Sequence, residues 1–340
     1  MEEVRKILVI RLKSIGDIVF TLPAVHVIRA AHPNAQITFL VSQEHAALLE
    51  GFEEVNSTIQ VDRARFRGLH PYRTISEAVT LWRSLRAERF SVVIDFQGYG
   101  ETGLLTWCTG ASKRWGTVYR AARRWAYTHG VRRRPGQHPA ESHLELLKDC
   151  GLPASAPRNE FKLPAAAADS AKVFFAKQTL DPRRATLFIQ PFTSSRPKDW
   201  PLEGYLELGR QWLSEGKQVL FGGGPDDRAA LAPATQAGFP VSAGTPLLVT
   251  AGLMKLSSVV LGGDTGMLHL AVALGKRVVM TMRGTGPGSC YPFQHRDWAV
   301  TPAAGRPVAA IGLDTIRQAC ARALTEQESA TGGISLQGER

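Results

Sequence analysis

Residues 10–25, IRLKSIGDIVFTLPAV, place a carboxylate in a turn that could do chemistry. An apolar run ends at Ile10, a short polar segment follows, and Gly16 and Asp17 stand just before the next apolar residues. The G-x-G-x-x-G pattern of dinucleotide-binding turns is missing here. A carboxylate in such a turn can accept a proton as a general base. The alternative is that Asp17 only caps a helix that begins near Ile18.

Residues 190–201, QPFTSSRPKDWP, form a second polar turn after an apolar run. Thr193 and Ser194 supply neighbouring hydroxyls, and Lys198 supplies a cation shortly before a Trp-Pro helix start. Hydroxyls and a lysine at a strand-to-helix turn suit a diphosphate. A polar loop without a ligand remains the alternative interpretation.

Residues 261–275, LGGDTGMLHLAVALG, form a third candidate turn. Asp264 or Thr265 is a suitable N-cap, and Gly266 leaves room for a ligand at the first turn of the helix. A helix N-terminus attracts anions because its first N–H groups lack partners within the helix. His269 follows one turn later and could donate to such an anion, although a plain capped helix explains the same residues.

Residues 220–231, LFGGGPDDRAAL, could form a fourth. No G-K-[ST] follows the glycines, so this is not a Walker A motif. Asp226 or Asp227 can accept from ribose hydroxyls or cap the next helix, and the sequence favours neither role.

The elements that must position these turns are apolar runs alternating with helical patterns, which predicts α/β domains with doubly wound parallel sheets. The predicted strands are 7–10, 37–41, 58–61, 91–96, 186–192, 218–223, 259–263 and 277–282. We expect two Rossmann-like domains, 1–170 and 171–326, facing across a cleft, and a disordered tail over 327–340. The second would hold a nucleotide, and the first would present a carboxylate and positive charge to a second substrate.

The composition sets limits on the class of protein. The 340 residues suffice for about two domains, and 44% of them are hydrophobic. The four cysteines form no C-x-x-C pair, the N-terminus is unlike a signal peptide, and no apolar run is long enough to span a bilayer. We therefore expect a cytoplasmic protein. No metal-binding pattern is visible, so no metal and no cofactor are expected.

The net charge of +11 is unevenly distributed. Residues 102–140 contain no Asp or Glu, and Arg63, Arg65 and Arg67 form a second cluster. The basic residues of the longer segment are Lys113, Arg114, Arg120, Arg123, Arg124, Arg132, Arg133 and Arg134. Such fields attract nucleic acid, anionic lipid or a phosphorylated substrate, although a solvated basic surface is the simplest explanation.

Five motifs, in order along residues 5 to 325, resemble the ADP-heptose:lipopolysaccharide heptosyltransferases of glycosyltransferase family 9. They are ILVIRLKSIGDIVFTLPAV, VVIDFQG, KDWP, the Gly-Gly-Pro-Asp turn and GGDTGMLHLAVALG. The resemblance implies a GT-B fold and metal-independent, inverting transfer of heptose from ADP-heptose to the lipopolysaccharide inner core. The acceptor would be Kdo-lipid A or a heptosylated core, with peripheral contact at the cytoplasmic face of the inner membrane and no nucleic acid.

The resemblance also implies roles for particular residues. Asp17 would deprotonate the acceptor hydroxyl, and Lys198 would neutralise the departing diphosphate. Donor binding would fall to Thr193, Ser194, Asp227, Asp264, Thr265, Gly266 and His269. Acceptor binding would fall to Arg63, Arg65, Arg67 and Arg120, which would meet carboxylates and phosphates.

The segment MRGTGPGSCYP, residues 282–292, departs from the family pattern because Arg283 stands where a glycine is common. This departure is compatible with a different donor sugar. Two alternatives therefore accompany the heptosyltransferase interpretation. One is a GT-B transferase for another nucleotide sugar in envelope glycan assembly, and the other is a non-catalytic binder of anionic ligands or nucleic acid.

Overall fold

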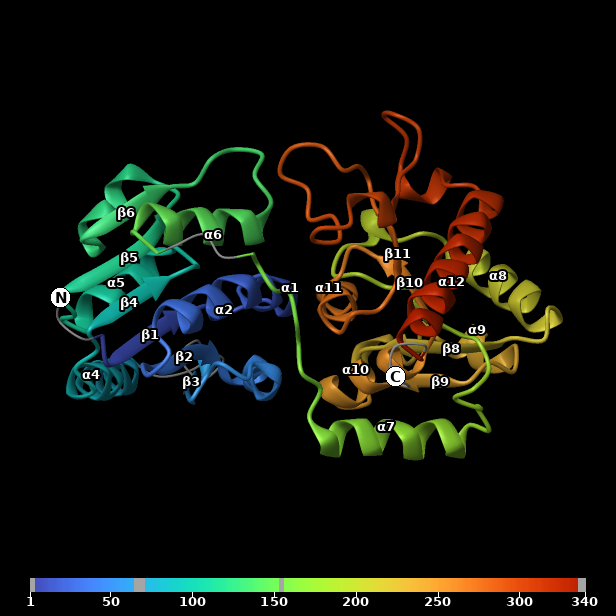
Figure 1. Cartoon of the computed structure of the whole chain (residues 1–340), viewed down its shortest axis with the longest axis horizontal. Coiled ribbons are helices and arrows are strands. Elements are labelled where there is room, and N and C mark those ends of the chain that lie inside the picture. The colour runs from blue at the N-terminus through green and yellow to red at the C-terminus, as the bar shows by residue number, and fades with distance from the viewer. Residues whose placement is uncertain (1–3, 64–70, 153–155, 336–340) are drawn as a thin grey trace. The chain divides into compact units, whose positions relative to one another are not determined.

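The computed structural model describes residues 4–63, 71–152 and 156–335, and it divides into two compact units, Met1–Asn159 and Glu160–Arg340 (Figure 1). The sequence-based boundary at 170/171 falls inside helix α7 (Ala165–Lys177). This helix packs on α10 (Leu247–Leu256), where Ala171 lies so close to Gly252 that a side chain at Gly252 would overlap it. The whole of α7 therefore belongs to the second unit, because its alanine face is buried there.

The first unit is built on a six-stranded parallel sheet in the order β3-β2-β1-β4-β5-β6. The central strands carry continuous buried residues, as expected of strands covered on both faces. The strands are β1 (Lys6–Ile10), β2 (Gln36–Ser42), β3 (Ser57–Val61), β4 (Val92–Asp95), β5 (Lys113–Val118) and β6 (His129–Arg132).

Helices cover both faces of this sheet. The core of one face joins Leu8, Ile10 and Val93 to Leu85 of α4 and, at its margin, Leu105 of α5. Right-handed crossovers that run in opposite directions across the sheet place α2 on the other face, where it packs on α6. The helices are α1 (Ile15–Val19), α2 (Leu22–Ala31), α4 (Pro71–Ala87), α5 (Gly100–Cys108) and α6 (Pro139–Asp149), with 3₁₀ segments η1 (Gln43–Gly51) and η2 (Ala121–Ala126).

The second unit repeats this plan with the order β12-β11-β10-β7-β8-β9. Trp212 of α8 and Ile316 of α12 share one core with the side chains of Leu187 and Leu261. Figure 1 shows α10 and α11 on the opposite side of this sheet from α8 and α12. The strands are β7 (Thr186–Gln190), β8 (Gln218–Gly223), β9 (Val241–Ala243), β10 (Val259–Gly263), β11 (Val278–Thr281) and β12 (Ala299–Val300).

The remaining helices of this unit are short except for the last one. The α-helices not yet bounded are α8 (Leu202–Ser214), α9 (Ala232–Gln236), α11 (Gly266–Ala273) and α12 (Leu313–Ser335). The 3₁₀ segments are η3 (Arg196–Lys198), η4 (Pro225–Asp227), η5 (Arg296–Trp298) and η6 (Val308–Ala310). Helix α12 thus continues to Ser335, past residue 326, where the sequence analysis expected the ordered domain to end. Within the described ranges, every helix is too short or too polar to cross a bilayer.

Both sheets follow the doubly wound order that the sequence predicted. In the first sheet the chain adds β2 and β3 on one side of β1 and then β4 on its other side, and in the second sheet it does the same with β8, β9 and β10 around β7. The strand order therefore reverses between β1 and β4 and between β7 and β10. Ligands in open α/β sheets bind beyond the carboxyl ends of strands at such reversals. The turns after these four strands are therefore where a site is expected. They contain Asp17, the VIDFQG motif, Lys198 and the D-T-G motif.

Candidate active site

The turn after β1 holds Asp17 at the start of α1. One carboxylate oxygen, Oδ2, accepts from the backbone N–H of Ser14 at 3.2 Å and from its hydroxyl at 3.3 Å. The same oxygen lies 2.8 Å from a guanidinium nitrogen of Arg11. Asp17 therefore does help to cap α1, but an ion pair with a buried arginine is more than a cap requires.

Arg11 is fixed by contacts on either side of the turn. Its other donors reach the carbonyl of Phe96 at 2.8 Å and that of Lys13 at 3.1 Å, so the guanidinium ties the end of β1 to the end of β4. Burial by itself would raise the pKa of Asp17, but the charge and hydrogen bond of Arg11, with the N–H of Ser14, hold that pKa below its ordinary value. The carboxylate is therefore ionised and held in one orientation at neutral pH.

Residues at the end of β4 and in the turn after it hold the turn of Asp17 in place. The carboxylate of Asp95 is fully buried and accepts from the N–H groups of Gln97 and Gly98 and, at 2.7 Å, from the hydroxyl of Tyr127. The side chain of Gln97 in turn accepts from the N–H of Leu12 at 2.8 Å. Asp95, which lies in the VVIDFQG motif of the family resemblance, thus helps to position the two turns.

A cavity of about 120 Å³ opens beside Asp17 within the first unit. Its polar rim combines two cations, Arg11 and Arg133, with the aromatic rings of Tyr99 and Tyr119, whose centroids lie 6.1 Å apart. The guanidinium of Arg133 stands over the Tyr119 ring at 5.5 Å. Cations and flat rings around a carboxylate suit a sugar that carries negative charge.

His143 lies at the wall of this cavity, and it was not among the residues predicted from the sequence. Its Nδ1 is 3.1 Å from the carbonyl of Phe20, which can only accept, so this nitrogen carries the proton in the neutral ring. Burial, followed by the charge of Arg11, lowers the pKa of His143 to about 3. The imidazole is neutral at physiological pH, and its other nitrogen is an acceptor.

The four arginines predicted to bind the acceptor are not equivalent. Arg63 pairs with Glu101 at 3.0 Å, so much of its charge is already matched. Arg120 is exposed at the start of η2. Arg65 and Arg67 lie outside the described residues. Instead, Arg133 of the longer basic segment lines the cavity beside Asp17.

In the second unit, the turns after β7 and β10 bring Lys198, Asp264 and His269 together. Lys198 Nζ lies 2.7 Å from Oδ2 of Asp264, and His269 Nε2 lies 3.2 Å from Oδ1 of the same carboxylate. Burial would raise the pKa of Asp264, but hydrogen bonds from His269 and Lys198 outweigh it and leave that pKa lowered. An ammonium has three donors, so Lys198 retains two for an anion.

Two glycines allow these turns to approach each other. A Cβ at Gly263 would overlap Cγ2 of Thr193, and one at Gly262 would overlap the carbonyl of Gln190. Thr193 occupies the space so gained. Its backbone N–H binds Asp199 at 2.9 Å, and its hydroxyl accepts from the N–H of Ser195 at 3.1 Å. Ser194 between them is exposed.

The helix start in D-T-G and the acid in the glycine-rich turn both act as caps. Thr265 is the N-cap of α11 and accepts from the N–H of Met267 at 3.1 Å, while Gly266 is the first helical residue. Asp227 accepts from the N–H of Gly224 at 2.7 Å, so it is Asp227 that closes this turn, and Asp226 is exposed. Each cap leaves oxygen lone pairs that a ligand could use.

All of the predicted donor residues thus lie at the carboxyl ends of the neighbouring strands β7, β8 and β10 of one sheet. In the described part of the chain, no group of three or more His, Cys, Asp or Glu side chains is arranged to hold a metal ion. The residues that sequence reasoning missed, Arg11, His143 and Tyr99, all lie in the first unit. A parallel sheet brings the turns after β1 and β4 together, and that rule alone could have drawn attention to Tyr99.

Comparison with known proteins agrees with the fold and the motifs. Residues 78–306 match the model of glycosyltransferase family 9 (heptosyltransferase). The chain is 23% identical to the lipopolysaccharide core heptosyltransferase OpsX of Haemophilus influenzae, over 88% of this chain and 85% of that protein. It is 26% identical to lipopolysaccharide heptosyltransferase 2 of Escherichia coli, over 86% of each.

Solved structures of similar proteins share the fold of the whole chain. A family 9 glycosyltransferase from Veillonella parvula superposes with a TM-score of 0.85 at 20% identity, covering 95% of this chain and 99% of that one. The ADP-heptose lipopolysaccharide heptosyltransferase II of E. coli gives a TM-score of 0.76 at 21% identity, with the same coverage. The predicted GT-B fold is thus confirmed, and the chain belongs to glycosyltransferase family 9 and is a glycosyltransferase.

Proposed function

We propose that this glycosyltransferase moves a heptose from ADP-heptose to the inner core of lipopolysaccharide. The match to the family model carries the proposal, because it covers residues 78–306 and the family is described as one of heptosyltransferases. The similar E. coli enzyme WaaC has been crystallised with ADP-2-deoxy-2-fluoro heptose and with ADP. The acceptor would be Kdo-lipid A or a heptosylated core, and contact with the cytoplasmic face of the inner membrane would be peripheral.

In the proposed reaction the acceptor hydroxyl attacks the anomeric carbon from the side opposite ADP. The new C–O bond forms as the bond from that carbon to the diphosphate oxygen breaks, which inverts the anomeric centre. The hydroxyl proton passes to Asp17. A carboxylate whose pKa is held low by Arg11 is a weak base, so this transfer comes late, when bonding to the sugar has made the hydroxyl acidic.

The leaving diphosphate develops charge that the second unit is equipped to meet. Lys198 has two ammonium donors beyond the one directed at Asp264, and the N-terminus of α11 contributes the positive end of its dipole. Hydroxyls of Thr193, Ser194 and Thr265 would bind phosphate oxygens, and Asp227 would accept from the ribose. The proposed chemistry draws on these side chains and N–H groups and needs no metal.

The decisive experiment measures transfer and donor binding in the same variant. In Asp17→Asn we expect transfer from ADP-heptose to heptose-deficient lipopolysaccharide, followed by mass spectrometry, to fall by about a hundredfold to ten-thousandfold. The rise in melting temperature caused by ADP should stay, because the second unit is unchanged. Asp169→Asn, an exposed carboxylate on α7, is the matched control and should behave as the native protein. Full transfer by Asp17→Asn would exclude the proposed base.

A different nucleotide sugar is the second candidate donor, and Arg283 is the observation that favours testing it. This residue is exposed two positions after the end of β11, where the family commonly has a glycine. Melting curves with ADP-heptose and with other ADP-, UDP- and GDP-sugars separate the two possibilities, because only a bound donor raises the melting temperature. Stabilisation by ADP-heptose alone would support the heptosyl donor.

A further inference from the structure

Large apolar side chains are exposed together on one part of the first unit. Trp82 of α4 is 42% exposed, Leu104 and Trp107 of α5 are 49% and 52% exposed, and Trp125 of η2 is 55% exposed. Burying such side chains is favourable, and an apolar patch in water commonly marks an interaction site. Tryptophan in particular prefers an interface where one edge is apolar and the other is wet.

These side chains are paired by a groove and by a ring contact. Trp82 and Leu104 line one apolar groove of about 560 Å³ between α4 and α5, which reaches Leu12 at the turn after β1. The rings of Trp107 and Trp125 meet edge to face with centroids 6.1 Å apart. The groove thus runs from Trp82 and Leu104 to the turn that carries Asp17, and Trp107 lies one turn after Leu104 on α5.

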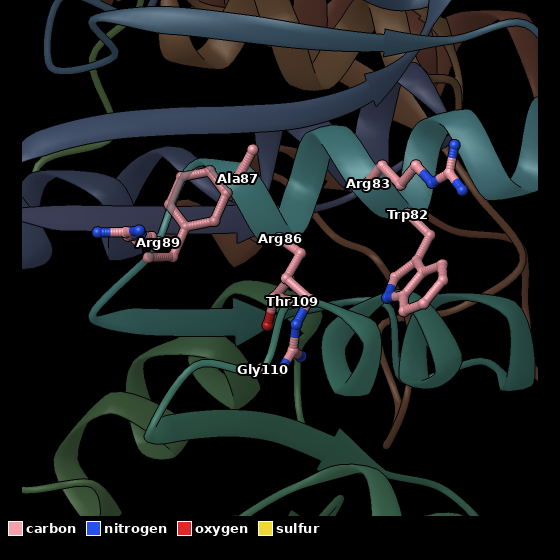
Figure 2. Close-up of a pocket in the computed structure, with 8 residues that line it drawn as sticks. Trp82, Arg83, Arg86, Ala87, Arg89, Thr109 and Gly110 are labelled. Carbon is pink, nitrogen blue, oxygen red and sulfur yellow. The ribbon is translucent and has the colours of Figure 1, made fainter.

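Trp82 also lines a second, open depression of about 750 Å³ at the end of α4. Three arginines of that helix end, Arg83, Arg86 and Arg89, line it with Thr109 and Gly110 (Figure 2). Figure 2 shows Arg86 extending from α4 toward the Thr109–Gly110 turn, whereas Arg83 and Arg89 project away from it to either side. The three guanidinium groups are therefore spread along the surface instead of converging on one point.

The described part of the chain leaves the charge of these arginines unpaired. Across the described ranges, the guanidinium groups of Arg83, Arg86 and Arg89 take part in no hydrogen bond or ion pair. The nearby acids are engaged elsewhere, since Glu88 binds Lys6 at 2.9 Å and Glu101 binds Arg63 at 3.0 Å. The depression therefore presents a positive field to solvent.

Two backbone features accompany these arginines. Arg89 adopts φ +52°, in the left-handed region that glycine favours and that costs other residues about 1 kcal/mol. Gly110, at φ +67°, leaves the space that the Arg86 guanidinium fills, and a Cβ there would overlap it. An arginine at the left-handed position after α4 has no evident packing role, since its side chain is exposed.

We propose that the α4–α5 surface, formed by Trp82, Arg83, Arg86, Arg89, Leu104, Trp107 and Trp125, docks the enzyme on an anionic lipid bilayer. The arginines bind lipid phosphates, and the tryptophans and Leu104 enter the interfacial layer. The identity of this partner rests on the proposed function, because an acceptor with a lipid anchor lies in a bilayer. The groove then offers a path from the bilayer to the turn of Asp17.

The spread of the arginines and the exposed tryptophans favour a bilayer over other anions. A single phosphate is bound best by donors that converge on it, and these do not. Nucleic acid would gain from the charges, but it has little use for Leu104 or the apolar groove. A bilayer matches both features, because its phosphates lie in a plane directly above an apolar layer.

The test is co-sedimentation of the full-length protein with vesicles of phosphatidylcholine alone or with phosphatidylglycerol added. We expect binding only to the anionic vesicles, and weaker binding by about tenfold or more in Arg83→Glu/Arg89→Glu. Arg183→Glu/Arg322→Glu, two exposed arginines of the second unit, has the same net charge and should bind normally. Trp82→Ser/Trp107→Ser should also bind less, with less quenching of tryptophan fluorescence by brominated lipid.

Several outcomes would overturn the docking surface. One is an equal loss of vesicle binding in the two charge-reversal double variants, and another is binding to phosphatidylcholine vesicles as strong as binding to the anionic vesicles. The others are release of the protein from vesicles by millimolar inorganic phosphate and tighter binding to RNA than to vesicles. Each variant is also melted with and without ADP, and the ADP-induced rise should be unchanged. If the native protein does not bind anionic vesicles but ADP still raises its melting temperature, the docking surface is wrong and the proposed reaction is unaffected. If ADP does not raise the melting temperature of the native protein, the result counts against the proposed reaction and not against the docking surface.

Discussion

The ion pair between Asp17 and Arg11 meets two requirements of the proposed base. The carboxylate must be ionised to accept a proton, and it must be oriented, and Arg11 achieves both by binding Oδ2 while anchoring itself to the carbonyl of Phe96. The cost is basicity, because the same ion pair holds the pKa of Asp17 below its ordinary value. The pair also stabilises the fold at neutral pH, and this contribution is lost as the pH falls through the lowered pKa.

Removal of Arg11 should move the acidic limb of the activity profile. In Arg11→Met burial remains while the compensating charge is gone, so the pKa of Asp17 should rise above its ordinary value and the limb of kcat/KM should shift upward by about one to three pH units. The measurement is kcat/KM against pH, with circular dichroism to confirm folding and Arg322→Met as the exposed-arginine control. A folded Arg11→Met enzyme with the native acidic limb would contradict the assignment.

Sequence reasoning could single out Asp17, Lys198 and Asp264 as candidates because each lies in a short polar motif after an apolar run. It could not identify Arg11 or His143. The contacts that define them, to Phe96 and Phe20, join residues far apart in the chain. A basic residue at the end of a strand and a lone histidine in an amphipathic helix carry no local sign of a role.

At the scale of elements, close packing of two turns organises the second unit. Gly263 at the end of β10 lets the β7–α8 loop approach until Thr193 fills the place of a side chain, and this brings Lys198 to Asp264. The G-G-D-T-G segment is thus a packing motif as well as a helix start. Its function depends on the absence of a Cβ.

Gly263→Ala should therefore weaken nucleotide binding without a direct contact. The added Cβ overlaps Thr193 and must displace the β7–α8 loop, at a cost of about 1–3 kcal/mol in the free energy of unfolding. We expect a lower melting temperature and a smaller rise on addition of ADP. Gly100→Ala, where the new methyl group meets open space, should change neither. An unaltered response to ADP in Gly263→Ala would show that the approach of the turns is dispensable.

Most strands that the sequence predicted are buried on both faces, although the predicted edge strand β3 alternates between buried and exposed residues. Those it missed lie toward the edges of the sheets. Strands β5 and β6 begin or end in basic residues and lie within the segment that was interpreted only as positive charge. Arg114, for example, donates to the carbonyls of Ala111 and Ala126, so part of that charge serves the local fold. Strands β9 and β12 are three and two residues long, too short for a period to show.

At the scale of the whole molecule, the proposed reaction assigns two tasks to one topology. Both sheets reverse direction at equivalent strands, but the first reversal carries a carboxylate among cations and the second carries hydroxyls, a lysine and a helix N-terminus. The common fold therefore supplies positions, and the turn residues decide which ligand each unit binds. The two Rossmann-like sheets were predictable from the alternation of apolar runs. The boundary between the two units was harder to predict, because the alanine-rich sequence of α7 has the composition of a linker.

This division of tasks predicts where ADP should slow hydrogen exchange in the full-length enzyme. A nucleotide held by the second unit should protect amides of residues 190–200, 222–228 and 263–270, because these turns supply its predicted contacts and bound N–H groups exchange more slowly. The turns of residues 11–17 and 96–100 should exchange at the same rate with and without ADP, and Lys198→Ala should reduce protection in the second unit. Mass spectrometry of peptides resolves these segments separately. Protection of residues 11–17 by ADP alone would mean that the turn of Asp17 takes part in nucleotide binding, and the assignment of that turn to the acceptor would have to be abandoned.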